Sequence, residues 1–316
     1  MTISTYVNTF GQFMLHRYGE RVHKLSINAE FTCPNRDGTI GRGGCTFCNN
    51  TSFNPNGRVP GSIAQQINAG KSVIAKRTRA KKFMAYFQAY TNTYDTTEKL
   101  KHLYDLALAE PDIVGLSVGT RPDCVTSDVL DLLARYRDQG YEIWLELGLQ
   151  SSFNITLEQV NRGHGFEEYN KTVHKARALN IPVCTHLMIG LPGECGMHAH
   201  ITHERVLEEG VDGLKLHPLH IVKGTQIANQ WRRGEYEPWS LERYINIASE
   251  LIENTPPEVV FHRLTGTASA RLLLAPDWCQ WKWRVINGIE HELKRRKTSQ
   301  GQAWFREQAR YEKAQH

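Results

Sequence analysis

Three cysteines that lie close together are the residues of this sequence best suited to chemistry. Cys33, Cys45 and Cys48 fall within 16 residues, in the spacing Cys-x11-Cys-x2-Cys. Four glycines between the first and second cysteine predict a flexible loop that can fold around a compact ligand. Three thiolates on one loop suit an iron–sulfur cluster, which normally takes four ligands, so that one iron would stay open to a further ligand.

Two other interpretations of this loop remain open. A Cys-x2-Cys pair is common in zinc sites, and His16 or His23 would then supply a fourth ligand. The same pair occurs in dithiol redox proteins, which need no third cysteine. The remaining cysteines stand alone in the sequence, so we expect them to be small buried residues rather than ligands of a second cluster. They are Cys124, Cys184, Cys195 and Cys279.

The composition is that of a soluble globular protein. The chain has 316 residues, of which 40% are hydrophobic and 22% are charged, which is enough apolar material for a substantial core. The net charge of +5 is compatible with a polyanionic partner but excludes a strongly basic nucleic-acid-binding tail. The sequence contains no apolar run long enough for a membrane span and does not begin like a signal peptide. We therefore expect a cytoplasmic protein without membrane partners, and the odd number of cysteines argues against a disulfide scaffold.

Strand-like and helix-like segments alternate along most of the chain. Repeated strand–helix units predict a parallel sheet with right-handed crossovers. The predicted strands are 22–27, 83–90, 113–119, 142–150, 182–190, 213–217 and 258–262, and the predicted helices are 62–80, 98–110, 127–139, 167–179, 199–209 and 241–253.

Each predicted strand has one apolar and one polar face. In 142–150, Leu145 and Leu147 share a face, whereas Glu146 and Gln150 point to the other side. Because a closed barrel fills its interior with apolar side chains, a polar inner face predicts an open barrel with a functional cavity. We therefore predict an α/β fold, a partial (open) parallel β/α barrel. It would comprise an N-terminal extension (1–20), the barrel (21–265) and a helical C-terminal extension (266–316).

Several motifs along this framework resemble those of the radical S-adenosylmethionine (SAM) superfamily. The resemblance covers about residues 5–285 and is strongest to its Elongator-catalytic-subunit-like branch, in particular to the bacterial YhcC-type family. The usual superfamily loop is Cys-x3-Cys-x2-Cys, and the wider first gap seen here also occurs in the Elongator-like branch. The motifs are CPNRDGTIGRGGCTFC (33–48), VGTRPDCV (118–125), WLELGLQS (144–151), GLPGE (190–194) and LKLHPLHIVKGT (214–225).

The resemblance implies a cofactor set and a reaction type. Cys33, Cys45 and Cys48 would hold three irons of a [4Fe–4S] cluster, and the fourth iron would bind the amino and carboxylate groups of SAM. A low-potential donor such as flavodoxin or ferredoxin would supply the electron that cleaves SAM. The resulting 5′-deoxyadenosyl radical would abstract a hydrogen atom from the substrate, while the protein positions the reactants and excludes solvent.

The resemblance also nominates residues that contact SAM or the substrate. Phe47 could instead pack the loop, Glu146 could form a salt bridge with Lys215 or Arg121, and Gly190 could simply make a turn. Arginines are included because a guanidinium binds carboxylates and phosphates in a bidentate manner. The candidates are Phe47, Gln88, Arg121, Glu146, Gln150, Arg162, Gly190 and Glu194.

The substrate is less clearly indicated. The basic stretches 71–82 and 294–297 could bind an RNA backbone, or could equally be solvated helix faces. Since the Elongator-like branch is associated with chemistry at the side chain of the wobble uridine, we expect tRNA as a partner. Two alternatives stay open. One is a radical SAM enzyme that acts on a small metabolite or a protein, and the other is a non-catalytic, zinc-stabilised RNA-binding protein.

Overall fold

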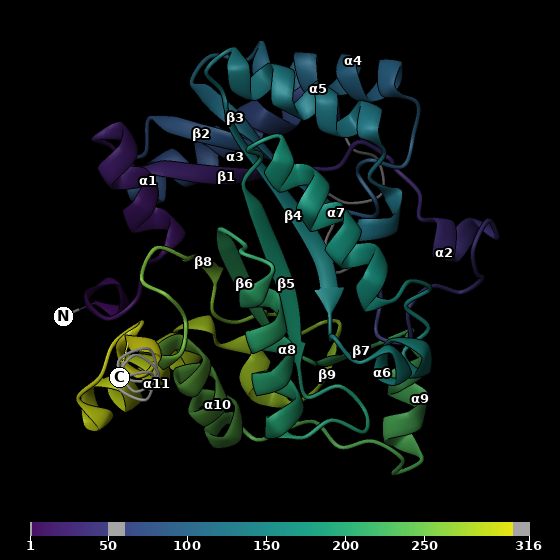
Figure 1. The fold of residues 1–316 in the computed structure, drawn as a ribbon, viewed down its shortest axis with the longest axis vertical. Helices are drawn as coiled ribbons and strands as arrows, with labels where there is room; N and C mark the ends of the chain where they lie inside the picture. Colours follow the sequence, from purple (N-terminus) through teal and green to yellow (C-terminus); the bar gives the residue numbers. More distant parts are fainter. Residues whose placement is uncertain (1, 50–60, 306–316) are drawn as a thin grey trace, which may run out of the picture.

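Seven parallel strands form a curled, open half-barrel in the computed structural model, which describes residues 2–49 and 61–305 (Figure 1). The strand order is β1-β2-β3-β4-β5-β6-β8, so each strand lies beside its predecessor in the barrel. This arrangement confirms the predicted fold class and all seven predicted strands. The strands are β1 (Val22–Ile27), β2 (Lys82–Phe87), β3 (Ile113–Thr120), β4 (Glu142–Gln150), β5 (Val183–Ile189), β6 (Gly213–Pro218) and β8 (Val260–Arg263).

Six crossover helices connect the strands and cover the outer face of the sheet (Figure 1). Four of them begin with a serine or threonine whose hydroxyl accepts a hydrogen bond from the first turn, at Ser62, Thr96, Thr126 and Ser240. Their positions agree with the predicted helices to within a few residues. They are α3 (Ile63–Thr78), α4 (Thr97–Leu108), α5 (Ser127–Asp138), α7 (Phe166–Ala178), α8 (Gly196–Glu208) and α10 (Leu241–Glu253).

Several short elements were not predicted, because most are too short to show a hydrophobic period. The C-terminal extension is also less helical than expected, since residues 266–281 contain a strand and a 3-10 helix before α11 begins. Residues 306–316 of that extension lie outside the described residues, and the three-part division of the chain stays a prediction. Helix α11 (Lys282–Arg296) lies in the extension that was expected to be helical. The additional elements are α1 (Phe10–Tyr18), α2 (Pro34–Asp37), α6 (Asn154–Gln159), β7 (Ile221–Val222), α9 (Gln226–Arg232), β9 (Leu273–Ala275) and the 3-10 helices η1 (Ile3–Thr5), η3 (Pro122–Cys124) and η4 (Asp277–Gln280).

The two faces of the sheet pack against different partners. Leu145 and Leu147 of β4 point outward into the main core beneath the crossover helices. On the inner face, Trp144 packs in a second cluster with Phe10 and Met14 of α1. The Phe10 and Trp144 ring centroids are 6.1 Å apart, in an edge-to-face arrangement. Helix α1 therefore closes the barrel at the amino ends of its strands, which leaves the carboxyl ends for a site.

The N-terminal and C-terminal segments lie side by side, at the left of Figure 1. The side-chain oxygen of Gln300 accepts a hydrogen bond from the backbone N–H of Asn8 at 2.8 Å, and the backbone N–H of Gln300 donates to the carbonyl of Tyr6 at 2.9 Å. Both ends of the described chain are thus fixed on the barrel. In residues 2–49 and 61–305, no helix combines the length and the apolar character that a membrane crossing requires.

Candidate active site

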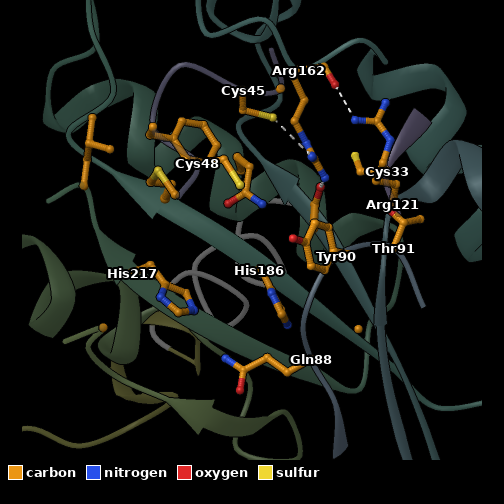
Figure 2. Close-up of a pocket in the computed structure, with 18 of the residues that line it drawn as sticks. Cys33, Cys45, Cys48, Gln88, Tyr90, Thr91, Arg121, Arg162, His186 and His217 are labelled. Carbon is orange, nitrogen blue, oxygen red and sulfur yellow. Dashed lines mark hydrogen bonds between the residues drawn. The ribbon is translucent and has the colours of Figure 1, made fainter. Parts of the chain in front are cut away.

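A cavity of about 200 Å³ opens at the carboxyl ends of the strands. Figure 2 shows the three loop cysteines at one end of this cavity and Gln88, His186 and His217 toward the other. Among the described residues, four arginines and three histidines line the cavity, but no aspartate or glutamate does. The charged and sulfur-bearing lining residues are Cys33, Arg36, Cys45, Cys48, Arg121, Arg162, His186, His217, His220 and Arg263.

Side chains within the cysteine loop anchor it to the barrel. Asn35 donates a hydrogen bond from Nδ2 to the carbonyl of Asn161 at 2.5 Å, and Arg36 donates from Nη2 to the carbonyl of Cys48 at 2.7 Å. The carbonyl of Thr46 accepts from the backbone N–H of Ile227, at the start of α9, at 3.0 Å. These contacts connect the loop to the segment after α6 and to α9.

Two of the predicted arginines lie at the cysteine end of the cavity. Arg162 donates from Nη1 to Sγ of Cys45 at 3.6 Å and from Nη2 to the carbonyl of Gly148. Arg121 donates from Nη1 to the carbonyl of Arg162 at 2.7 Å and forms a bidentate pair with Asp123 at 2.9 and 2.8 Å. Burial alone would lower the pKa of Arg121, but Asp123 raises it above its ordinary value. The chain thus provides the carboxylate that Arg121 binds.

The surroundings of the cysteines fit an iron–sulfur cluster. Buried polar atoms without a hydrogen-bond partner gather here, namely Nε of Arg162, Oδ1 of Asn35 and Oγ1 of Thr46. Burial and the neighbouring Cys45 raise the pKa of the Cys48 thiol to about 11, so grouped thiolates at this place call for a positively charged partner. Three thiols are the donor set that a [4Fe–4S] cluster uses while keeping one iron open.

The other SAM contacts that the sequence nominated fall into two groups. Phe47, Gln88 and Gln150 line the cavity, and Gln150 does so where β4 ends, with a left-handed φ of 84°. Gly190 and Glu194 lie outside the lining. The carbonyl of Gly190 accepts a hydrogen bond from the Tyr236 hydroxyl at 2.7 Å, and Glu194 accepts one from Ser151 at 2.5 Å. The first group is placed to contact a ligand of the cavity, and contact with SAM stays a prediction for all of them.

Glu146 lies beneath the cavity rather than in its lining. Its fully buried carboxylate forms a salt bridge with Lys215 and a second with Lys24 at 2.5 Å, and it contacts Nε2 of His186 at 2.8 Å. Ser117 donates a further hydrogen bond to it. The alternative to SAM contact, a salt bridge between Glu146 and Lys215, is therefore present. The four hydrogen bonds and ion pairs leave no free lone pair on the carboxylate for a ligand. We call Lys24, Ser117, Glu146 and Lys215 the polar floor.

The polar floor carries strongly shifted pKa values. Burial alone would raise the pKa of Glu146, but Lys215 and Lys24 lower it well below its ordinary value. Burial lowers the pKa of Lys215 to about 8, although Glu146 counteracts the shift. Burial and the Lys215 charge also lower the pKa of His186 to about 4. His186 is therefore neutral at pH 7, and its contact with Glu146 leaves the other ring nitrogen as an acceptor.

Sequence reasoning missed some residues of the site and misplaced one. Asn35 and Arg36 stand between the cysteines, where their position in the motif could have indicated an anchoring role. Arg263 lines the cavity, while its neighbour His262 packs against Trp144 in the barrel interior. Regular strand alternation places only one of two consecutive residues inward, so the sequence pattern did not indicate Arg263. Of the four isolated cysteines, Cys124, Cys184 and Cys279 are buried as predicted, whereas Cys195 is exposed at the start of α8, which corrects that expectation.

Comparison with known proteins agrees with this geometry. The family model described as the radical SAM superfamily matches residues 36–203, and the model of the radical SAM C-terminal domain matches residues 211–295. The chain belongs to the radical SAM superfamily. Members of this superfamily use a [4Fe–4S] cluster and SAM, which decides between the iron–sulfur and zinc interpretations of the cysteine loop.

Individual relatives extend the match to nearly the whole chain. The chain is 50% identical to the protein YhcC of Escherichia coli strain K12, over 93% of this chain and 94% of that protein. It is 37% identical to YtqA of Bacillus subtilis, over 95% and 93%. Among solved structures, the archaeal Methanocaldococcus infernus Elp3 with an N-terminal deletion has a TM-score of 0.66 at 18% identity. That match covers 88% of this chain but only 64% of the Elp3 chain, and it concerns the fold.

Proposed function

We propose that this protein is a radical SAM enzyme that abstracts a hydrogen atom from the C5 substituent of a wobble uridine in tRNA. Superfamily membership and the cavity beside three cysteines support the radical chemistry. The resemblance to the Elongator-like branch supports a wobble uridine as the nucleoside that is modified. The observation that carries the choice of tRNA is an exposed basic surface on the barrel.

The residues of the chain divide the work of the site. When bound, the reduced cluster and SAM supply homolytic cleavage of a carbon–sulfur bond and thus a hydrogen-abstracting radical. Cys33, Cys45 and Cys48 hold the cluster. Phe47 and Gln150, on the cavity wall, orient SAM and exclude water from it. The electron comes from a low-potential donor protein of the flavodoxin or ferredoxin type.

The basic surface lies at the C-terminal end of α3. Lys76, Arg77, Arg79 and Lys81 are exposed there, and no ion pair with another described residue involves any of them. Exposed cations of this kind bind phosphate backbones by displacing counterions. We call these four residues the α3 basic surface. It supports tRNA binding, whereas the binding of a small metabolite would not need it.

The second basic stretch, 294–297, does not provide a comparable surface. Arg295 pairs with Glu292 at 2.7 Å, and Arg296 pairs with Glu292 at 2.7 Å and with Glu253 at 3.4 Å. Both arginines of this stretch are thus paired within α11, and Arg296 also connects α11 to α10. Of the two stretches that the sequence offered, we therefore retain the first for tRNA.

The test measures 5′-deoxyadenosine release by the reduced, cluster-loaded enzyme under three conditions. These are SAM alone, SAM with total tRNA from cells that lack this protein, and SAM with a protein-free metabolite extract. We expect tRNA to stimulate release, and prior digestion of the tRNA with ribonuclease to abolish the effect. Stimulation by the metabolite extract alone would favour the small-metabolite alternative and reject tRNA. Replacement of the chemical reductant by reduced flavodoxin or ferredoxin tests the donor in the same assay.

A further inference from the structure

Arg263 is a cation of the cavity wall without a partner of its own. It lines the cavity from the end of β8, and within the described parts of the chain no hydrogen bond or ion pair involves its guanidinium. The other three arginines of the lining are engaged: Arg36 with the carbonyl of Cys48, Arg121 with Asp123, and Arg162 with Cys45. A guanidinium has five N–H donors, so an unused one on a cavity wall is available to a ligand.

A local irregularity of the sheet directs Arg263 into the cavity. The pairing of β6 with β8 shifts register between Leu214 and Lys215, so that Phe261 and Arg263 are successive partners and His262 is skipped. His262 fills the interior against Trp144, with ring centroids 4.3 Å apart. A bulge thus lets two consecutive residues face the barrel interior, which regular alternation forbids. Bulges of this kind re-aim side chains beside functional sites.

The electrostatic surroundings of Arg263 are those of an anion site. Its charge contributes, after burial, to the lowered pKa values of His217 and Lys282. The buried carboxylate of the polar floor, Glu146, is already paired with Lys24 and Lys215. Among the described residues the cavity lining contains no acid that could neutralise Arg263. Cations that face one another across a cavity without an acid repel, and an anion between them removes that repulsion.

This cationic end is separate from the place that SAM occupies in the proposed function. The cysteines and Arg162 mark one end of the cavity, and His217, whose pKa Arg263 influences, lies at the other end (Figure 2).

We propose that Arg263, together with His217 and Gln88, forms a subsite that binds an anionic group of the substrate, a carboxylate or a phosphate, at the end of the cavity opposite the cysteines. The proposal rests on the proposed function only in taking this cavity as the substrate site. A planar guanidinium binds either anion through two parallel hydrogen bonds, and neutral His217 and Gln88 can complete the contacts. A substrate that lacks the anion would leave Arg263 unpaired and would bind less tightly.

The experiment uses acetate and inorganic phosphate as probes of the two anion types. Thermal unfolding of the cluster-loaded protein is followed at constant ionic strength, with each probe replacing chloride. Binding to the folded state should raise the wild-type Tm by about 2 °C or more at saturating probe. The shift should vanish in Arg263→Gln and persist in part in Arg263→Lys, which keeps the charge but loses the planar fork. The matched control is Arg271→Gln, an exposed arginine of the following loop outside the cavity lining, which should shift like the wild type.

The outcomes separate this proposal from the proposed function. A shift with acetate alone indicates a carboxylate on the substrate, and a shift with phosphate alone indicates a phosphate; both support the subsite. Equal shifts in the wild type and both Arg263 variants would overturn it, as would the absence of any shift in the wild type. SAM affinity, measured by equilibrium dialysis, gives the remaining outcome. A loss of SAM affinity in Arg263→Lys would assign Arg263 to SAM and overturn the proposal. None of these results depends on tRNA being the substrate.

Discussion

Glu146 illustrates how one buried charge organises this site. It lies on the inner face of β4, fully buried, with cations from β1 and β6 on its two oxygens. A buried carboxylate is tolerated only with such partners, and the partners in turn depend on it. The polar floor therefore fixes four strands, β1, β3, β4 and β6, relative to one another directly beneath the cavity.

Removal of this charge should be costly to stability. In Glu146→Gln, Lys24 and Lys215 lose the carboxylate while remaining in the barrel interior, so we expect a loss of about 3–5 kcal/mol in the free energy of unfolding. Urea denaturation of both proteins measures the difference. The control Glu204→Gln changes an exposed glutamate of α8 and should alter stability by no more than about 0.5 kcal/mol. Similar losses for both variants would contradict the role of the polar floor.

The pH dependence of the stability difference between wild type and Glu146→Gln provides a second prediction. The folded-state pKa of Glu146 lies well below its ordinary value of 4.5, so the unfolded chain binds this proton more readily than the folded protein. The stabilisation is therefore complete above that ordinary value and is lost as the pH falls toward the folded-state pKa. We expect the stability difference between wild type and Glu146→Gln to shrink as the pH falls below the ordinary value. A difference that kept growing below that value would reverse the sign and reject the assignment.

The sequence predicted the positions of some site residues but not of others. Cys33, Cys45 and Cys48 were singled out by their spacing, because metal ligands on one loop are local in sequence, but their assignment to a [4Fe–4S] cluster came from the resemblance to the radical SAM superfamily. Glu146 was placed on the inner face by its strand period, but whether it met SAM or Lys215 depended on a lysine 69 positions away. Arg263 was missed because its inward direction depends on the bulge in the β6–β8 pairing, and a bulge leaves no periodic signal.

At the scale of elements, the close approach of β3 and β4 depends on a glycine. Gly115 is the first residue of β3 to pair with β4, opposite Glu142. A Cβ atom at this position would lie 1.8 Å from the carbonyl oxygen of Glu142, which is backbone and cannot turn away. Gly115→Ala must therefore push β3 and β4 apart, and with them the two strands that carry Ser117 and Glu146.

Two glycine substitutions should therefore act in opposite directions. We expect Gly115→Ala to lower the free energy of unfolding by about 3 kcal/mol or more. In contrast, Gly11 lies exposed on α1 with nothing within 4 Å of its virtual Cβ, so Gly11→Ala should raise it by about 0.5–1 kcal/mol. Chemical denaturation of the two variants checks both signs. If Gly115→Ala left the free energy of unfolding unchanged, β3 and β4 would not be in the close contact described here.

Elements were predicted best where their hydrophobic period was long. The seven barrel strands and six crossover helices follow from alternation and amphipathic spacing. Helix α1 was missed although it closes the barrel, because Phe10 and Met14 are its only buried residues and mark too narrow a stripe. The segment before α11 was expected to be helical, but its pairing of β9 with β7 is a contact between residues some 50 positions apart that the local sequence does not reveal.

At the scale of the whole molecule, the distribution of charge bears on the proposed partner. The excess of five positive charges is small, but the α3 basic surface concentrates cations that no described acid neutralises. If tRNA binds there, each neutralised phosphate contact should appear in the salt dependence of binding. The double variant Lys76→Gln/Arg77→Gln should then reduce the slope of log K against log salt concentration by about 1.5.

The comparison variant for this titration is Arg295→Gln/Arg296→Gln, whose two arginines both pair with Glu292. We expect it to change the slope by less than about 0.5, since both arginines already have an internal partner. Fluorescence anisotropy with labelled tRNA at several salt concentrations gives both slopes. Equal slopes for the wild type and both variants would remove the α3 basic surface from the account of tRNA binding.

The central claim is that three cysteines of one loop hold a cluster that cleaves SAM, and metal analysis tests it most directly. Iron and sulfide are measured on protein purified without oxygen, together with 5′-deoxyadenosine released after reduction with SAM present. We predict about four irons and four sulfides per chain, and their loss together with SAM cleavage in Cys33→Ala, Cys45→Ala and Cys48→Ala. Cys195→Ala, which changes an exposed cysteine of α8, should keep both. One zinc per chain, no sulfide and intact SAM would contradict the account.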